Sequence, residues 1–183
     1  MRAFVALEVP GPVLDSLVQF QGEISSTGAD VKLVERENLH FTVRFLGEIT
    51  QAQASQACSK LGMLSPRRTS VEVRGAGAFP TVNRARVVWA GVARENVAVM
   101  SSIAADVVSA LDGIGERDDR PFQAHITLAR VRSPANLRQL GEVLARNPDR
   151  AFGTAELTEL KLKSSVLTPR GPVYSDVGVF PLK

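Results

Sequence analysis

The feature that most constrains the fold is a short pattern that occurs twice. The chain has two histidines, His40 and His125. Each begins the order histidine, apolar residue, threonine, apolar residue, written HFTV in the first copy and HITL in the second. In both cases a stretch with helical spacing of apolar residues follows. A chain of 183 residues that repeats a pattern in this way is expected to contain two similar α+β halves.

The spacing of apolar residues predicts an α+β fold with mostly antiparallel sheets. Thr50 is the expected N-cap of one helix, which Pro66 ends. No linker or low-complexity segment divides the chain, so residues 1–183 are expected to form a single bilobal domain. Strands are expected at 2–9, 31–34, 37–47, 70–79, 84–92, 122–131, 154–167 and 171–182, and helices at 13–24, 51–64, 95–111 and 134–146.

Composition places limits on the class of protein. The chain is 44% hydrophobic and 22% charged, which suffices for a folded core, and its net charge of +3 is compatible with a phosphate-bearing partner. The single Cys58 excludes an intrachain disulfide and argues against a thiolate metal site. No apolar run approaches the ~20 residues of a membrane helix. We therefore expect no membrane contact and a cytoplasmic protein.

The repeated pattern places reactive groups on one face of a strand. Side chains at positions i and i+2 share a face, so His40 should lie beside Thr42, and His125 beside Thr127. If the two strands meet, two imidazoles and two hydroxyls converge. One imidazole can then act as base and the other as acid, while the hydroxyls donate to phosphoryl oxygens. This arrangement suits metal-free hydrolysis of a phosphodiester, above all a strained cyclic one.

Two other interpretations of the histidines have to be considered. A single histidine on a half-buried strand is most often structural, and threonine is a good strand former in its own right. Two copies that contain every histidine of the chain favour catalysis over that interpretation. Metal binding is the second alternative. Two histidines alone rarely hold zinc, and no acidic residue lies at ligand spacing beside either of them.

Two arginines are candidates for phosphate binding. Arg44 lies four residues after His40, so on a regular strand it shares the face of His40 and Thr42. Arg130 lies five residues after His125, so it reaches that face only if the strand ends or bulges at Ala129. For both arginines the alternative is an ion pair in solvent.

These residues resemble the 2H phosphoesterase superfamily, which is named for two H-x-T/S-x motifs. More narrowly, the chain is similar to the bacterial and archaeal RNA 2′,3′-cyclic phosphodiesterases, also called 2′-5′ RNA ligases. The resemblance covers nearly the whole chain, since MRAFVALEVP, ENLHFTVRFLGEI, GAGAFPTVNRARVVWAGV, FQAHITLARV and LTPRGPVYSDVGVFPL occur in the family's order. One departure is Ala124, where members commonly have proline before the second histidine. This departure removes no reactive group.

The resemblance implies a fold and an activity. The fold would be two pseudo-symmetric lobes, each an antiparallel sheet with outer helices, around a central groove that carries both motifs. The activity would be hydrolysis of RNA 2′,3′-cyclic phosphate ends to 2′-phosphates without metal or other cofactor, and 2′-5′ RNA ligation would be the reverse reaction. His40 would be the proton donor and His125 the proton acceptor, and Thr42 and Thr127 would bind the phosphate.

RNA 3′ ends or cyclic nucleotides are the expected partners, and the default oligomeric state is a monomer. Phe79, Arg84 and Arg86 are candidates to hold a terminal base or a phosphate, although a core aromatic residue and surface charges would explain them equally well. Two alternatives stay open. One is a 2H enzyme for a small cyclic nucleotide or ADP-ribose cyclic phosphate. The other is a non-catalytic RNA-binding or nucleotide-binding module, against which two intact motifs argue.

Overall fold

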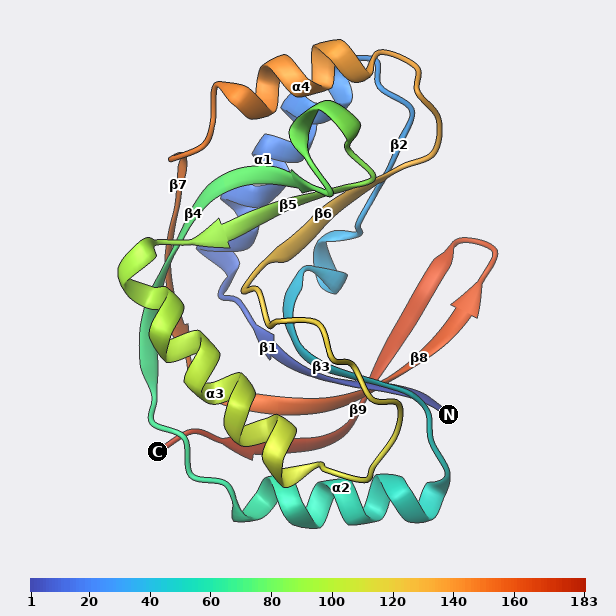
Figure 1. Ribbon diagram of the computed structural model, residues 1–183, viewed down its shortest axis with the longest axis vertical. Coiled ribbons are helices and arrows are strands. Elements are labelled where there is room, and N and C mark those ends of the chain that lie inside the picture. The colour runs from blue at the N-terminus through green and yellow to red at the C-terminus, as the bar shows by residue number, and fades with distance from the viewer.

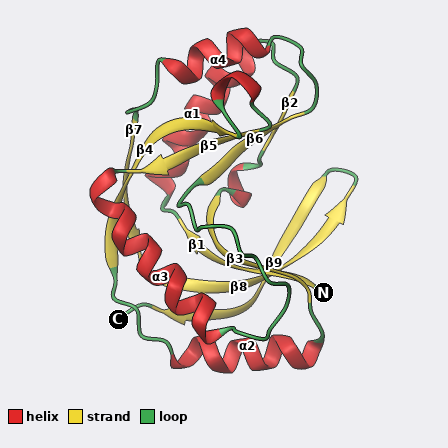
Figure 2. Ribbon diagram, viewed as in Figure 1, coloured by secondary structure: helices red, strands yellow, loops and turns green.

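Nine strands form one curled antiparallel sheet with helices on its outer sides (Figures 1 and 2). The computed structural model describes all residues, 1–183. In chain order the elements are β1 (Arg2–Glu8), α1 (Gly11–Ser26), β2 (Val31–Leu33), β3 (His40–Glu48), α2 (Gln51–Met63), β4 (Thr69–Phe79), β5 (Val87–Val92), α3 (Val97–Ala110), β6 (Ile126–Val131), α4 (Leu137–Ala145), β7 (Ala151–Leu157), β8 (Glu159–Thr168) and β9 (Gly171–Pro181). The predicted α+β class with mostly antiparallel strands is confirmed.

The order of the strands shows two halves that meet at a single contact. The sheet runs β7-β4-β5-β6-β3-β1-β8-β9, and β2 pairs with β6. Only one residue pair, Phe41 with Ile126, joins β3 to β6. The two halves of the sheet therefore separate on either side of this contact, and they form the upper and lower lobes in Figure 1.

The strand registers of the two halves correspond. In the lower lobe Ala6 on β1 lies opposite Thr42 on β3, and in the upper lobe Trp89 on β5 lies opposite Thr127 on β6. In both ladders the register shifts by one residue immediately after the threonine. A β-bulge at the same place in both ladders is strong structural support for the internal repeat that the two motifs predict.

Each half provides a helix for the other half. Helix α1 follows β1 of the lower lobe but contacts β7 and α4, whereas α3 follows β5 of the upper lobe but contacts β3 and α2. A continuous cluster of 40 buried hydrophobic residues extends through both halves. Each lobe thus buries its sheet against one helix of its own half and one of the opposite half.

Two of the sequence expectations can be compared in detail with the structure. Thr50 is the N-cap of α2, as predicted: its hydroxyl accepts from Gln53 N at 3.1 Å, and its own N–H donates to Gln53 Oε1 at 2.9 Å. The single strand expected at 154–167 is wrong. The chain leaves β7 at Leu157, passes Thr158 and enters β8, which pairs with β1 in the other lobe. Thr158 and Glu159 are two consecutive polar residues that shift the alternation by one position, from buried Ala155 and Leu157 to buried Leu160 and Leu162, and the sequence analysis did not use this break.

None of the helices combines the length and the apolar character that a membrane span requires.

Candidate active site

The two motifs meet at the contact between the lobes. Phe41 and Ile126, the middle residues of the motifs, pair with each other, and neither is exposed to solvent. Strand alternation then directs the histidine and threonine of each motif to the opposite face. Because the strands are antiparallel, each histidine lies towards the threonine of the other motif. The structure thus brings both imidazoles and both hydroxyls together, on the face that the sequence predicts.

The two imidazoles are held by the same backbone contact. Nδ1 of His40 lies 2.7 Å from the carbonyl oxygen of Asn38, and Nδ1 of His125 lies 2.7 Å from that of Gln123. A carbonyl can only accept, so Nδ1 carries the proton and donates in both rings. Nε2 of each ring therefore remains for proton transfer, and in His40 it lies 2.9 Å from Thr42 Oγ1.

Aromatic rings fix the orientation of both imidazoles. Phe4 on β1 stacks on His40 with ring centroids 5.1 Å apart, and Tyr174 on β9 packs its edge against the same ring at 5.6 Å. Phe79 at the end of β4 packs at right angles to His125 at 5.0 Å. Phe79 therefore belongs to the wall of the site, where it limits the movement of the second imidazole.

In the upper lobe the wall behind His125 is aromatic. Trp89 lies opposite Thr127 and packs against Phe79, with ring centroids 5.3 Å apart. Its indole covers Gly77, where an added Cβ would lie only 2.6 Å from the Trp89 ring. Gly77 is therefore required by the close approach of the indole. The sequence analysis singled out neither Gly77 nor Trp89.

In the lower lobe the wall beside His40 is charged. Glu8 lies opposite His40 in the β1–β3 ladder and contacts Lys163 Nζ at 2.6 Å and Lys161 Nζ at 2.8 Å. Asp176 contacts the same two ammonium groups at 2.8 and 3.1 Å. Burial opposes the charge on Glu8, but the hydrogen bonds from the lysines outweigh it and hold its pKa below the ordinary value. Glu159 also contacts Lys161 Nζ at 3.3 Å, so three carboxylates surround two ammonium groups, and the sequence analysis flagged none of them.

Both imidazoles favour the neutral form. Burial lowers the pKa of His40, against the hydrogen bond to Asn38, and the charge of Lys163 lowers it further. Burial also lowers the pKa of His125, and the charge of Arg130 acts in the same direction. Because one imidazole must be protonated and the other neutral for acid–base catalysis, these shifts determine the pH at which both conditions are met.

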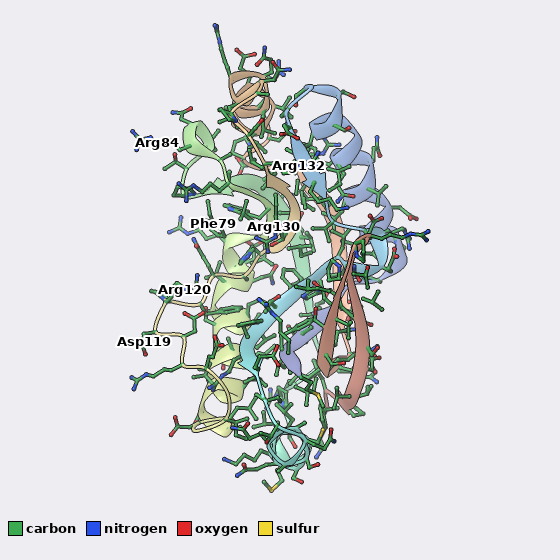
Figure 3. The ribbon with its side chains drawn as sticks, turned by 90° about the vertical axis from the view of Figure 1, so that its right-hand side faces the viewer. Phe79, Arg84, Asp119, Arg120, Arg130 and Arg132 are labelled. Atoms are coloured by element: carbon green, nitrogen blue, oxygen red, sulfur yellow. The ribbon has the colours of Figure 1, made fainter.

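Arg130 reaches the site through a bulge. Trp89 pairs with Thr127 and Val88 with Ala129, so Leu128 is the extra residue on β6. The bulge brings Arg130 to the face of Thr127, and it lies one residue before Ala129, where the sequence analysis placed the required bulge. Its side chain is exposed and has no hydrogen bond or ion pair within the protein. Figure 3 shows Arg130 near Phe79, consistent with their positions on either side of Val87 in the sheet.

Arg44 corrects the sequence analysis. A bulge at Val43 shifts the register of β3, so Arg44 faces away from His40, and the expectation that they share a face is wrong. Its guanidinium instead donates to the carbonyls of Val108 at 2.8 Å and Ile114 at 3.2 Å, at the end of α3. Phe45 takes the position on the face of His40 and Thr42. Arg44 therefore ties α3 to the sheet and lies on the face away from His40 and Thr42.

Arg84 and Arg86 are the two other arginines that the sequence analysis named as candidates to hold a base or a phosphate. Arg84 ends the short 3-10 turn Val82–Arg84, away from Arg130 in Figure 3, and Arg86 precedes β5. Both side chains are exposed and without ion pairs. No group of three or more histidine, cysteine, aspartate and glutamate side chains is arranged so that it could hold a metal ion.

The fold and the paired motifs define a phosphoesterase with two H-x-T sequences. The family model for LigT-like phosphoesterases matches the chain twice, over residues 7–89 and 92–174. Each match starts 33 residues before its histidine, counting from 7 to 40 and from 92 to 125. The chain belongs to this family, as the resemblance in the sequence indicated.

Relatives of known name and structure agree with this assignment. The chain is 34% identical over 180 residues to an RNA 2′,3′-cyclic phosphodiesterase of Archaeoglobus fulgidus, covering 98% of this chain and 99% of the relative. The crystal structure of TT0787 of Thermus thermophilus matches with a TM-score of 0.83 and 29% identity, covering 100% and 98% of the two chains. E. coli LigT complexed with 3′-AMP has the same fold, with a TM-score of 0.82, 23% identity and coverage of 100% and 98%.

Proposed function

We propose that this protein is an enzyme that hydrolyses the 2′,3′-cyclic phosphate at RNA 3′ ends and leaves a 2′-phosphate. The observation that carries the proposal is the pair of imidazoles, each with Nδ1 held by a backbone carbonyl and Nε2 left for proton transfer. The function of the Archaeoglobus fulgidus relative, which spans nearly the whole chain, supports the same substrate. Residues 1–183 act as one domain in this proposal, because the catalytic pair needs both lobes.

The proposed mechanism assigns a role to each half of the site. Water attacks phosphorus opposite the 3′ oxygen and gives its proton to Nε2 of His125. The bond between phosphorus and the 3′ oxygen breaks, and His40 donates a proton from Nε2 to that oxygen. Thr42 and Thr127 donate hydrogen bonds to the phosphoryl oxygens as they gain negative charge. The two imidazoles regain their starting states by exchanging protons with solvent.

Arg130 supports this division of roles. Its charge lowers the pKa of His125 and so favours the neutral imidazole that a general base requires. Because its guanidinium has no partner within the protein, it is also free to pair with a phosphoryl oxygen. At His40 the carboxylate of Glu8 favours the protonated form that a general acid requires, but burial and the charge of Lys163 lower the pKa overall.

The proposal is tested with two substrates and a chelator. The purified protein is incubated with a 2′,3′-cyclic mononucleotide and with an oligonucleotide that ends in a cyclic phosphate, each with and without EDTA. We expect 2′-phosphate products from the oligonucleotide and equal rates in EDTA, because acid–base groups alone supply the mechanism. Loss of activity in EDTA that one divalent ion restores would show a metal mechanism instead.

Other outcomes of this test separate the alternatives. Turnover of mononucleotides or ADP-ribose cyclic phosphate, with no turnover of the oligonucleotide, would indicate an enzyme for small cyclic nucleotides. Binding of the oligonucleotide without turnover would indicate a binding module. A cytoplasmic location and a monomeric state remain predictions, and both are open to measurement on the same protein.

The pH dependence of the reaction follows from the two imidazoles. We expect a bell-shaped profile of kcat/KM, in which the acid limb reports protonation of His125 and the basic limb reports loss of the proton from His40. Both pKa values are lowered from their ordinary value of about 6.5. Both limbs therefore shift towards acid, and the optimum should lie below pH 6.5.

The check is kcat/KM measured over a wide pH range for the wild type and for Arg130→Gln. Removing the positive charge should raise the pKa of His125 and move the acid limb to higher pH. An optimum clearly above neutrality in the wild type, or an acid limb that does not respond to Arg130→Gln, would contradict the assignment.

A further inference from the structure

Two cationic side chains from opposite lobes meet at one end of the site. Lys32 lies on β2 of the upper lobe, and Arg170 lies at the tip of the β8–β9 hairpin of the lower lobe. Both elements are on the right-hand side of Figure 1, the side that faces the viewer in Figure 3. Lys32 Nζ donates to the backbone carbonyl of Arg170 at 3.5 Å. An ammonium group has three N–H donors, so this contact leaves two of them free.

No carboxylate neutralises these two cations. Lys32 lies opposite Arg130 in the β2–β6 ladder, so the side chains of Lys32 and Arg130 share one face of the sheet. Lys32, Arg130 and Arg170 are all exposed, and none of them has an ion pair within the protein. The next arginine on β6, by contrast, is neutralised, because Arg132 contacts Asp30 at 3.0 Å. Cationic groups that gather without a counter-ion favour an anionic ligand.

The hairpin that carries Arg170 is fixed relative to the first imidazole. Asn38 donates from Nδ2 to the carbonyl of Pro172, two residues after Arg170, at 3.1 Å. The carbonyl of Asn38 accepts from Nδ1 of His40 at 2.7 Å. Tyr174 on the same hairpin packs its edge against the His40 ring, with centroids 5.6 Å apart. These contacts place Arg170 on the His40 side of the site.

The hollow beside the hairpin has one cationic wall and one acidic wall. Its volume is about 410 Å³. Arg170 lines it from the hairpin, whereas Glu35 and Glu37 line it from the segment that begins the 3-10 turn Arg36–Asn38. Neither carboxylate has an ion pair within the protein. A phosphate group that passes this hollow is therefore repelled by the turn and attracted to the rim formed by Arg170 and Lys32.

We propose that Lys32 and Arg170 bind the phosphodiester that links the terminal nucleotide to the one before it, so that the enzyme prefers RNA ends to cyclic mononucleotides. This inference rests on the proposed function. There His40 protonates the 3′ oxygen of the terminal ribose, so that ribose lies towards His40. The 5′ oxygen of the same ribose carries the linking phosphodiester, which brings it to the side of the site where Arg170 and Lys32 meet. The guanidinium and the ammonium each donate to its charged oxygens.

Two dinucleotides that end in a 2′,3′-cyclic phosphate test the charge of the linking group alone. One has a phosphodiester link, the other an uncharged methylphosphonate, and both carry a 2′-O-methyl group on the first ribose. In the wild type kcat/KM should be roughly tenfold higher for the phosphodiester, because each exposed charge contact contributes roughly threefold. The ratio should fall to roughly threefold in Lys32→Gln and in Arg170→Gln, and to about one in the double variant.

Arg146→Gln is the matched control. Arg146 is exposed at the end of α4 and has no ion pair, so this variant loses one positive charge away from the hairpin and should keep the wild-type ratio. A ratio of about one in the wild type, or a wild-type ratio in the double variant, would overturn the subsite. An equal fall of the ratio in Arg146→Gln would also overturn it, because net charge would then explain the preference.

A binding measurement separates this proposal from the proposed function. The same two dinucleotides, ending in a 2′-phosphate instead of the cyclic phosphate, are titrated by calorimetry into the wild type and the Lys32→Gln, Arg170→Gln double variant. We expect the wild type to bind the phosphodiester compound more tightly and the double variant to bind both compounds equally. If this difference is present but no cyclic phosphate is hydrolysed, the proposed reaction fails and the subsite stands. If cyclic phosphates are hydrolysed but the wild type binds both compounds equally, the reaction stands and the subsite fails.

Discussion

Replacing His40 by Ala should lower the rate of cyclic phosphate hydrolysis by roughly a hundred- to ten-thousand-fold, and His125→Ala should do the same. In the proposed mechanism each imidazole performs one of two proton transfers, and an alanine side chain can perform neither. The variants should remain folded. Both side chains are only half-buried, and the core residues beneath them, Phe41 and Ile126, are unchanged. Activity of the purified variants and their thermal unfolding are the measurements.

Asparagine variants distinguish a chemical role from a structural one. In His40→Asn and His125→Asn the side-chain amide can still donate to the carbonyl of residue 38 or 123, as Nδ1 does in the wild type. It has no group that can carry a proton from Nε2. The asparagine variants should therefore be as inactive as the alanine variants. If they regained most of the activity, the imidazoles would serve only to hold the backbone. Near wild-type turnover in any of the four variants would end the two-histidine mechanism.

The double variant gives a further check. His40 and His125 act on one transition state, so their effects should not multiply. Once one proton transfer is lost, removal of the second group should cost much less than it does in the wild type. Losses that multiply would mean that each imidazole contributes to the transition state independently of the other.

The sequence predicted the part of the site that depends on local geometry. Strand alternation is enough to place His40 with Thr42 and His125 with Thr127, and to place Phe41 in the core. The repeat of the motif was enough to predict two related halves. These predictions needed only the two-residue alternation of side chains on a strand and one repeated motif, and both can be recognised directly in the sequence.

What the sequence did not predict depends on register and on partners distant in the chain. The bulge at Val43 moves Arg44 away from the face of His40, and the bulge at Leu128 moves Arg130 onto the face of Thr127. No local sequence pattern shows where a strand gains an extra residue. The charged wall beside His40 joins Glu8 to lysines more than 150 positions later. Tyr174, the only tyrosine, reaches His40 from the last strand. Such contacts appear only once the strand order is known.

The two walls also explain why a repeated site can have different roles for its two histidines. Lys163 lies opposite Phe4 in the lower lobe, and Phe79 holds the corresponding place opposite Val87 in the upper lobe. The His40 half therefore has a cluster of ion pairs where the His125 half has aromatic rings. The duplication preserved the reactive groups, while the neighbouring strands gave each imidazole a different environment.

A substrate with sulfur in place of the 3′ oxygen should show which histidine is the acid. A thiolate leaves without a proton, whereas an alkoxide needs one. On the 3′-thio cyclic substrate, His40→Ala should regain most of its lost rate. Its deficit in kcat/KM relative to the wild type should be at least tenfold smaller than on the oxygen substrate. His125→Ala should stay slow, because water still has to lose a proton to a base. The measurement is kcat/KM of the wild type and both variants on the two substrates, under conditions where chemistry limits the rate.

The pattern of rescue decides between three assignments. Rescue of His40→Ala alone supports His40 as the acid and places the leaving ribose on the charged side of the site, next to Tyr174. Rescue of His125→Ala alone would exchange the roles and put the ribose against Phe79 and Trp89 instead. Equal rescue of both would mean that the cyclic phosphate binds in either orientation. In that case the different walls of the two lobes would not orient the substrate, even though the reactive groups are the same two imidazoles.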